Sequence, residues 1–303
     1  MPLLQSSQAR LHFIVLLWGF TAVLGALIYL DALELVWYRM GIAVLSLWLF
    51  FRWKGTSLRT PFKSLLPFFG AGAIIMVHWV TFFHAIKIST VSVTLACLST
   101  AAFFTSILEP IFYKKKFEWS EMLLGIIAIA GILVVFQFES DYTMGIIMAL
   151  CSAFLGATFT VINGLLVRKH RSDIITIYEL GGGWLLLGIY LQIGGSFNEG
   201  LPALKGYDLL WLLILATVCT AYAFIESVEV MRELNPFTVV LTINLEPIYG
   251  ILLAWLILGK EEQMSGAFYF GASLILASVI ANGLLKRWRK RKANKTEIKA
   301  ELK

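Results

Sequence analysis

The sequence predicts an all-α integral membrane protein with ten transmembrane helices in two inverted five-helix repeats. Three observations predict this fold: a composition with few charges, long apolar runs along the whole chain, and a match between its two halves. Of the 303 residues, 59% are hydrophobic and 15% are charged, whereas about a quarter of a typical soluble domain is charged. Because so few charges cannot cover a water-facing surface of this size, we expect the chain to lie in a lipid bilayer.

Each predicted span is an apolar run long enough to cross a hydrocarbon core of about 30 Å. In order, the ten runs cover residues 11–30, 32–51, 65–86, 90–113, 121–137, 144–166, 174–193, 209–230, 236–258 and 265–285. The first run is longer than the core of a signal peptide, and no small-residue cleavage site follows it, so we expect a span there. The connections between the runs are short and leave no room for a soluble domain.

The distribution of basic residues predicts the orientation. With an even number of spans both termini lie on one side, and if that side is the cytoplasm, 21 Lys and Arg residues lie inside and three outside. Such a bias is typical of cytoplasmic segments, so we expect a multi-pass protein of the cell membrane with both termini in the cytoplasm. A basic tail at residues 286–303 holds nine of these residues and accounts for much of the net charge of +6 without a nucleic-acid partner.

The two halves of the chain match when one is shifted along the other. A shift of 146 residues superposes the later spans and places Gly125 on Gly271, and a shift of 140 superposes the earlier ones. Each half contains five spans, an odd number, so the halves must cross the membrane in opposite directions. We therefore predict a first repeat at residues 1–138 and an inverted second repeat at residues 139–285, an arrangement typical of transporters.

Four segments follow one another in a recognisable order. They are "LLWGFTAVLG" in the first span, "YRMGIA" in the second, "TFFHAIKIST" ending the third and "LNPFTVVLTINLEPIYGILLAWLILGKE" around the ninth. In this order and spacing the chain resembles the EamA-type permeases of the drug/metabolite transporter superfamily over nearly its whole length. The resemblance implies a membrane carrier, usually an exporter of small metabolites, with a central cavity between the repeats. Many first repeats carry a proline matching Pro247, but this sequence has Ala101 there, so a matching kink is not predicted.

Glu246 and Pro247 stand side by side in the apolar stretch "TINLEPIYGILLAW". A charged side chain at the centre of a membrane helix costs about 2.5–3.5 kcal/mol, and proline removes a backbone hydrogen bond. Both are tolerated where the helix lines a wet cavity or packs within protein. We predict that Glu246 and Asn244 bind substrate and that Pro247 and Gly250 form a hinge. The alternative is a packed kink with a neutral or paired glutamate.

Arg39 is the one basic residue deep within a predicted span. A buried guanidinium needs a carboxylate, backbone carbonyls or water around it. We predict an anion site for a substrate carboxylate. The alternative is a structural ion pair with Glu34, Glu179 or Glu246, and the two roles are compatible.

Glu179, His78 and Trp79 are further candidates for substrate binding. Glu179 is followed by glycines at residues 181–183, which either weaken the helix or let another backbone approach closely. His78 either relays a coupling proton or is hydrogen-bonded in the packing between helices. Aromatic residues that could face the cavity, or else anchor the helices at the interface, are Trp18, Tyr38, Tyr178 and Tyr222.

Glu109, Glu179, Glu226 and Glu229 lie in the inner halves of predicted spans. They either form an acidic vestibule that attracts a cationic or zwitterionic solute, or they pair with basic neighbours. For Glu109 and Glu229 we expect pairing, with Lys114–Lys116 and with Arg232 respectively.

These features predict a secondary transporter, and specifically an exporter, of a small polar or amphipathic metabolite such as an amino acid, working by alternating access. Its expected partners are that metabolite, the lipid bilayer, and a coupling proton or a counter-substrate. The alternatives are a passive channel and an intramembrane enzyme. The sequence has no HExxH motif, no paired aspartates in spans and no zinc-type cysteine spacing, so we expect no catalytic residue, metal or cofactor.

The predicted topology can be tested by cysteine-accessibility labelling of a cysteine-free variant. A cysteine at Ser57 or in the basic tail should react only after the membrane is opened, and one at Asn198 should react in intact cells. Labelling of residue 198 only in opened membranes would contradict the assignment of the repeats.

Overall fold

The computed structural model describes residues 6–117, 119–198, 200–234, 239, 242–243 and 245–301. The first half contains helices α1 (Ser7–Leu27), α2 (Ala32–Trp53), α3 (Phe62–Ile88), α4 (Val91–Leu98), α5 (Ala101–Tyr113) and α6 (Trp119–Phe138). The second half contains α7 (Thr143–Leu166), α8 (Ser172–Ile193), α9 (Asp208–Ala216), the π-helical η3 (Thr217–Tyr222), α10 (Ala223–Val230), α12 (Glu246–Leu258) and α13 (Gly266–Glu301). Two short 3₁₀ turns are η2 (Ser140–Tyr142) and η4 (Gly259–Glu262).

The helices have the lengths that membrane spans require. Within the described residues, seven segments are long and apolar enough to cross a membrane, and three shorter apolar helices lie at residues 123–135, 246–258 and 266–278. The shorter helices fall inside the three remaining predicted spans. The predicted all-α membrane fold is therefore confirmed, while the number of ten spans stays a prediction.

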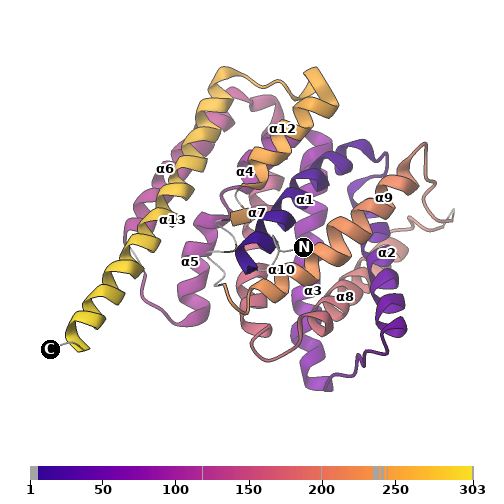
Figure 1. The fold of residues 1–303 in the computed structure, drawn as a ribbon. Helices are drawn as coiled ribbons and strands as arrows, with labels where there is room; N and C mark the ends of the chain where they lie inside the picture. Colours follow the sequence, from indigo (N-terminus) through magenta and orange to yellow (C-terminus); the bar gives the residue numbers. More distant parts are fainter. Residues whose placement is uncertain are drawn as a thin grey trace.

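Contacts between the halves are reciprocal (Figure 1). Helix α1 packs on α12, and α7, the matching helix of the second half, packs on α4 and α5. In the same way, α3 packs on α8, and the equivalent contact in the other direction joins α9 to α2. A third pair of equivalent contacts joins α3 to α7 and α10 to α1. Helices α6 and α13 pair with each other at one edge of the molecule. Two related halves would produce this pattern, although the boundaries of the repeats stay a prediction.

Helices α3 and α8 approach so closely that their backbones touch. A Cβ atom at Gly72 would overlap the carbonyl oxygen of Glu179, and one at Gly183 would lie 2.6 Å from the carbonyl oxygen of Gly72. Of the two roles considered for the glycines after Glu179, close backbone approach is therefore the one observed. Lipid gives little hydrophobic driving force between helices, so such small-residue contacts contribute much of the packing.

Glu262, in η4, caps the N-terminus of α4 and so joins the second half to the first. Its carboxylate accepts hydrogen bonds from the backbone N–H groups of Val91 (3.0 Å) and Ser92 (2.9 Å) and from the Ser92 hydroxyl (2.7 Å). The first N–H groups of a helix have no partner within the helix, and the positive end of the helix dipole favours an anion there. Because Glu262 is buried, water cannot replace it as the acceptor.

Replacing Glu262 by alanine should lower the thermal stability of the purified protein in detergent. The change leaves buried N–H groups unpaired, at a cost of about 1–3 kcal/mol. Glu139→Ala is the control, because Glu139 accepts hydrogen bonds from an exposed residue, Ser265, and its loss should matter less. Equal melting temperatures for Glu262→Ala and the wild type would contradict the capping role.

Candidate functional site

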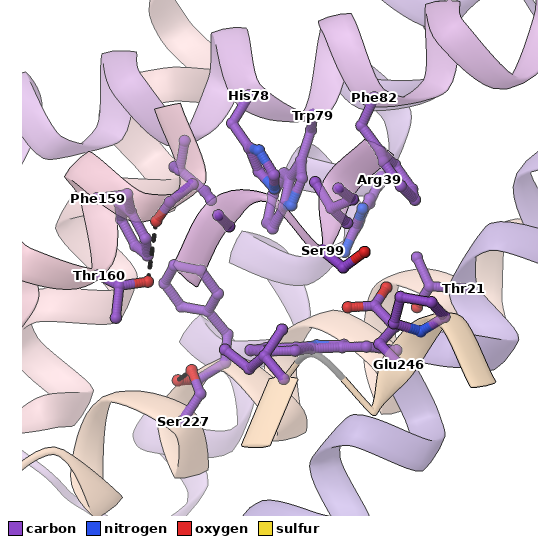
Figure 2. Close-up of a pocket in the computed structure, with 18 of the residues that line it drawn as sticks. Thr21, Arg39, His78, Trp79, Phe82, Ser99, Phe159, Thr160, Ser227 and Glu246 are labelled. Atoms are coloured by element: carbon purple, nitrogen blue, oxygen red, sulfur yellow. Dashed lines mark hydrogen bonds between the residues drawn. The ribbon is translucent and has the colours of Figure 1, made fainter. Parts of the chain in front are cut away.

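A pocket lies between the two halves of the protein, and side chains from both halves line it (Figure 2). Its walls are largely apolar and include the aromatic rings of Trp18 and Trp79 from the first half and of Phe159 and Phe224 from the second. The empty space amounts to about 870 Å³ when the part open to the outside is included. Small-molecule sites typically combine apolar walls with a few polar groups.

Six of the residues predicted from the sequence line this pocket: Trp18, Arg39, His78, Trp79, Glu246 and Pro247. Five others lie outside its lining: Tyr38, Tyr178, Glu179, Tyr222 and Gly250. Asn244 falls outside the described residues.

Arg39 is buried in α2, with 2% of its surface exposed. Its Nε donates a hydrogen bond to the Thr220 hydroxyl at 2.6 Å, and its guanidinium carbon lies 3.8 Å from the centre of the Trp79 ring. No carboxylate among the described residues lies within ion-pair distance of it. Nη1 is buried and has no hydrogen-bond partner in the described part of the chain. Within the described part of the chain, Arg39 therefore has no ion-pair partner in contact with it, and it keeps a free donor at the pocket wall.

The π-helical segment η3 brings Thr220 to Arg39. Here the Thr220 hydroxyl donates to the carbonyl of Leu215, five residues earlier, at 2.6 Å. The same oxygen accepts from Arg39, so one hydroxyl satisfies both a loosened backbone turn and the guanidinium. Single π turns within α-helices occur frequently at functional sites.

Glu246 is the first residue of α12, and Pro247 lies in the first turn of that helix. Proline suits this place because the first N–H groups of a helix have no intrahelical acceptor. Glu246 is 5% exposed, and no described residue forms a hydrogen bond or an ion pair with its carboxylate. In Figure 2 the carboxylate lies toward the same end of the pocket as Arg39 and Ser99. Among the described residues, the pocket thus contains one cation and one carboxylate that form no ion pair within 4 Å.

Two glycines set the position of Glu246. A Cβ atom at Gly19 in α1 would lie 3.1 Å from the backbone nitrogen of Gly250 and 3.4 Å from the carbonyl oxygen of Glu246. A Cβ atom at Gly250 would in turn overlap the Leu95 side chain. Gly250 therefore serves close packing of α12 on α1 and α4, and its role as a hinge stays a prediction.

The matching helix of the first half is also interrupted, although it has Ala101 in place of proline. Helix α4 ends at Leu98 and α5 begins at Ala101. Between them the Ser99 hydroxyl donates to the carbonyl of Ala96, and the Thr100 hydroxyl donates to the carbonyl of Cys97 at 2.7 Å. These local bonds compete with the helical ladder, and Ser99 at the interruption lines the pocket.

His78 both lines the pocket and joins α3 to α7. Its Nδ1 lies 2.8 Å from the carbonyl oxygen of Ser152 and 2.9 Å from the Ser152 hydroxyl, which donates back to the His78 carbonyl at 3.0 Å. A carbonyl only accepts, so Nδ1 carries a proton and donates. The hydrogen-bonded packing role considered for His78 is therefore observed, and proton relay stays a prediction.

The predicted tyrosines hold connections rather than the pocket. The hydroxyl of Tyr38 donates to the carbonyl of Pro202 at 2.9 Å, and that of Tyr178 donates to the carbonyl of Leu58 at 3.0 Å. Tyr222 differs from these two: it is 43% exposed, and its ring contacts the ring of Phe13 edge to face.

The acidic residues near the inner helix ends are paired. Glu109 binds Lys115 at 2.9 Å, Glu229 binds Arg232 at 2.9 Å and Glu226 binds Arg10 at 3.1 Å. The expected pairing of Glu109 and Glu229 is observed. Because all three carboxylates are paired, they do not form an unneutralised acidic vestibule.

Small polar residues of the pocket escaped the sequence analysis. The pocket lining includes four hydroxyl residues, Thr21, Ser99, Thr160 and Ser227. Thr220 accepts a hydrogen bond from Arg39. Each is a lone hydroxyl in an apolar span, and such residues commonly bond to their own helix. A buried arginine in a membrane span needs a hydrogen-bond acceptor from another span. A search for hydroxyl groups that could meet this need is the signal that would have singled out Thr220.

The chain belongs to the EamA-like transporter family, whose sequence profile matches residues 11–137 and again residues 143–284. The uncharacterized transporter YdfC of Bacillus subtilis (strain 168) is 24% identical over 217 residues, 68% of each chain. An uncharacterized transporter of Helicobacter pylori (strain ATCC 700392 / 26695) is 24% identical over 273 residues, 86% of this chain and 89% of its own. One solved crystal structure is similar in fold, with a TM-score of 0.67 and 16% identity, over 92% of this chain and 98% of its own.

The resemblance to EamA-type permeases of the drug/metabolite transporter superfamily is confirmed. The protein is a multi-pass membrane transporter, and the pocket between its halves is its candidate substrate site.

Arg39→Ala should weaken transport while leaving membrane insertion intact. Loss of a hydrogen bond to a charged group costs about 1.5–3 kcal/mol, about 10- to 100-fold in affinity. Arg39→Lys should restore little, because an ammonium cannot reproduce the planar fork stacked on Trp79. The measurement is substrate exchange in proteoliposomes, normalised to inserted protein. If Arg39→Ala exchanges substrate as fast as the wild type, Arg39 has a structural role and does not bind substrate.

Proposed function

We propose that the protein is a secondary transporter that exports a small zwitterionic metabolite, such as an amino acid with an apolar side chain. The observation that carries this proposal is the pair of unpaired opposite charges, Arg39 and Glu246, in one aromatic pocket. An unpaired buried charge is costly, so each of these groups gains most from a ligand of the opposite sign.

A zwitterion satisfies both charges at once. Its carboxylate would accept from the free Nη1 donor of Arg39, since guanidinium groups match carboxylates geometrically. Its ammonium group would donate to Glu246. An apolar side chain would then contact Trp79, Phe159 and Phe224, which line the same pocket. A purely cationic or purely anionic solute would leave one of the two protein charges unpaired.

Alternating access is supported by the interrupted helices. The pocket adjoins the break between α4 and α5 and the start of α12, which come from opposite halves of the chain. In transporters with inverted repeats, such broken helices lie at the substrate site, and one half rocks against the other. We place the protein in the cell membrane with both termini in the cytoplasm, as the distribution of basic residues indicates.

A passive channel is the principal alternative, and an intramembrane enzyme is a remoter one. Counterflow separates a carrier from a channel: proteoliposomes loaded with unlabelled leucine should take up labelled leucine faster than empty ones. A channel would show no such acceleration. Comparing the metabolites released by cells with and without the gene would identify the exported solute, and an unchanged medium would contradict export.

Substitutions of Glu246 and Pro247 should have distinguishable effects. Glu246→Gln keeps the shape and removes the charge, so the protein should fold while transport or its pH dependence changes. Pro247→Ala supplies an N–H group that lets the helix extend backwards. It should leave stability at least as high but slow the exchange between inward-open and outward-open states. The measurements are exchange in proteoliposomes and thermal stability.

Pro110→Ala is the matched control, because Pro110 lies inside α5 and outside the pocket lining. If Glu246→Gln exchanges substrate at the wild-type rate across the pH range, Glu246 does not belong to the substrate site.

A further inference from the structure

A second group of buried polar side chains lies beside the pocket. It consists of Glu179 and Thr176, which are one turn apart on α8, and Asn163 on α7, whose carboxamide is the polar neighbour of the Glu179 carboxyl group. All three residues are fully buried. Four of their oxygens have no hydrogen-bond partner in the described part of the chain: both of Glu179, Oδ1 of Asn163 and Oγ1 of Thr176. We call this group the Glu179 cluster.

No described cation neutralises the cluster, since none lies within 4 Å of Glu179. Helices α2, α3 and α10 pack against α8, and the titratable side chains on their nearby turns are engaged elsewhere. Arg39 binds Thr220, and His78 binds Ser152. Glu226 and Glu229 on α10 pair with Arg10 and Arg232.

An ionised carboxylate is not stable in such a place. Burying a charge without a partner costs far more than burying a neutral hydrogen-bonding group. A protonated carboxyl group has one O–H donor, and its neighbour Asn163 has an unpaired acceptor, Oδ1. Protonation thus converts Glu179 from an uncompensated charge into a group that its surroundings can satisfy.

The cluster is connected to the substrate pocket through α7. Asn163 follows the pocket-lining residues Phe159 and Thr160 by one turn, and its Nδ2 donates to the Phe159 carbonyl at 3.4 Å. On the other side, α3 packs at Gly72 directly on the backbone of Glu179, and α3 also carries the pocket residues His78 and Trp79. A movement of α3 or α7 that opens the pocket would therefore also change the access of water to Glu179.

We propose that Glu179 is the proton-binding residue that couples substrate export to proton entry. This proposal rests on the proposed transport function. While the Glu179 cluster is buried, as in this structure, Glu179 holds its proton. When water reaches the cluster, the O–H bond breaks, the proton passes to water and the carboxylate remains, hydrated, until a proton from the opposite side restores it.

Infrared spectroscopy of the purified full-length protein tests proton binding without a substrate. The wild type at neutral pH should show the carbonyl stretching band of a buried protonated carboxylic acid, and Glu179→Gln should lose it. Glu109→Gln is the control, because Glu109 is a buried glutamate that forms an ion pair with Lys115, and the Glu109→Gln variant should keep the band. An unchanged band in Glu179→Gln would overturn the proposal. If that variant does not fold, Glu179→Asp should keep the band at a shifted frequency, and an unshifted band would overturn it.

Proteoliposomes test the coupling, with labelled leucine as the probe. Glu179→Gln should retain exchange of leucine but lose accumulation driven by a pH gradient, whereas Glu109→Gln should retain both. Accumulation retained by Glu179→Gln would overturn the coupling role. A wild type that does not carry leucine would count against the proposed substrate, and the infrared result would still decide the state of Glu179. A sodium site is the alternative. It would be indicated, and proton binding overturned, if NaCl but not choline chloride raised the melting temperature of the wild type and this effect were lost in Glu179→Gln.

Discussion

A helix in a membrane can leave backbone groups without helical partners only where protein or water supplies other partners. This constraint explains where the irregular segments of this protein lie. The break between α4 and α5, the start of α12 at Glu246 and the π turn at Thr220 all adjoin Arg39 or its pocket. Hydroxyl groups satisfy two of them, and the third has in its first turn a proline, which has no N–H group to satisfy. Irregular backbone and polar side chains therefore gather in the same place.

The charges follow the same rule. Among the described residues, Arg39 has one hydrogen bond and the rings of Trp79 and Phe83 as partners, and the Glu246 carboxylate has no hydrogen bond or ion pair. Both line the pocket, where in our account a zwitterion pairs with them. Glu179 lies outside the pocket lining, which is why we assign it a proton instead. Position relative to the pocket distinguishes the two glutamates, which are both buried and look alike in the sequence.

The sequence was sufficient to predict the fold class and part of the site. Charged residues and proline are so rare in apolar spans that Arg39, Glu246 and Pro247 stood out, and all three line the pocket. The faces of the helices were harder to predict, because an almost wholly apolar helix has no periodicity that separates lipid from protein. Tyr38 and Tyr178 were therefore placed near the cavity although they hold loops. The break at Ser99 was missed because it depends on local hydroxyl bonds rather than on proline.

The central claim is that Arg39 and Glu246 bind the two charged ends of one zwitterion. The most direct measurement is the thermal stability of the purified protein with each standard amino acid, and with the amide and the N-acetyl derivative of any that stabilises it. Our account predicts that an apolar amino acid raises the melting temperature, while its amide lacks the carboxylate for Arg39 and its N-acetyl derivative lacks the ammonium for Glu246, so neither does. Equal stabilisation by either derivative, or no stabilisation by any amino acid, would contradict it.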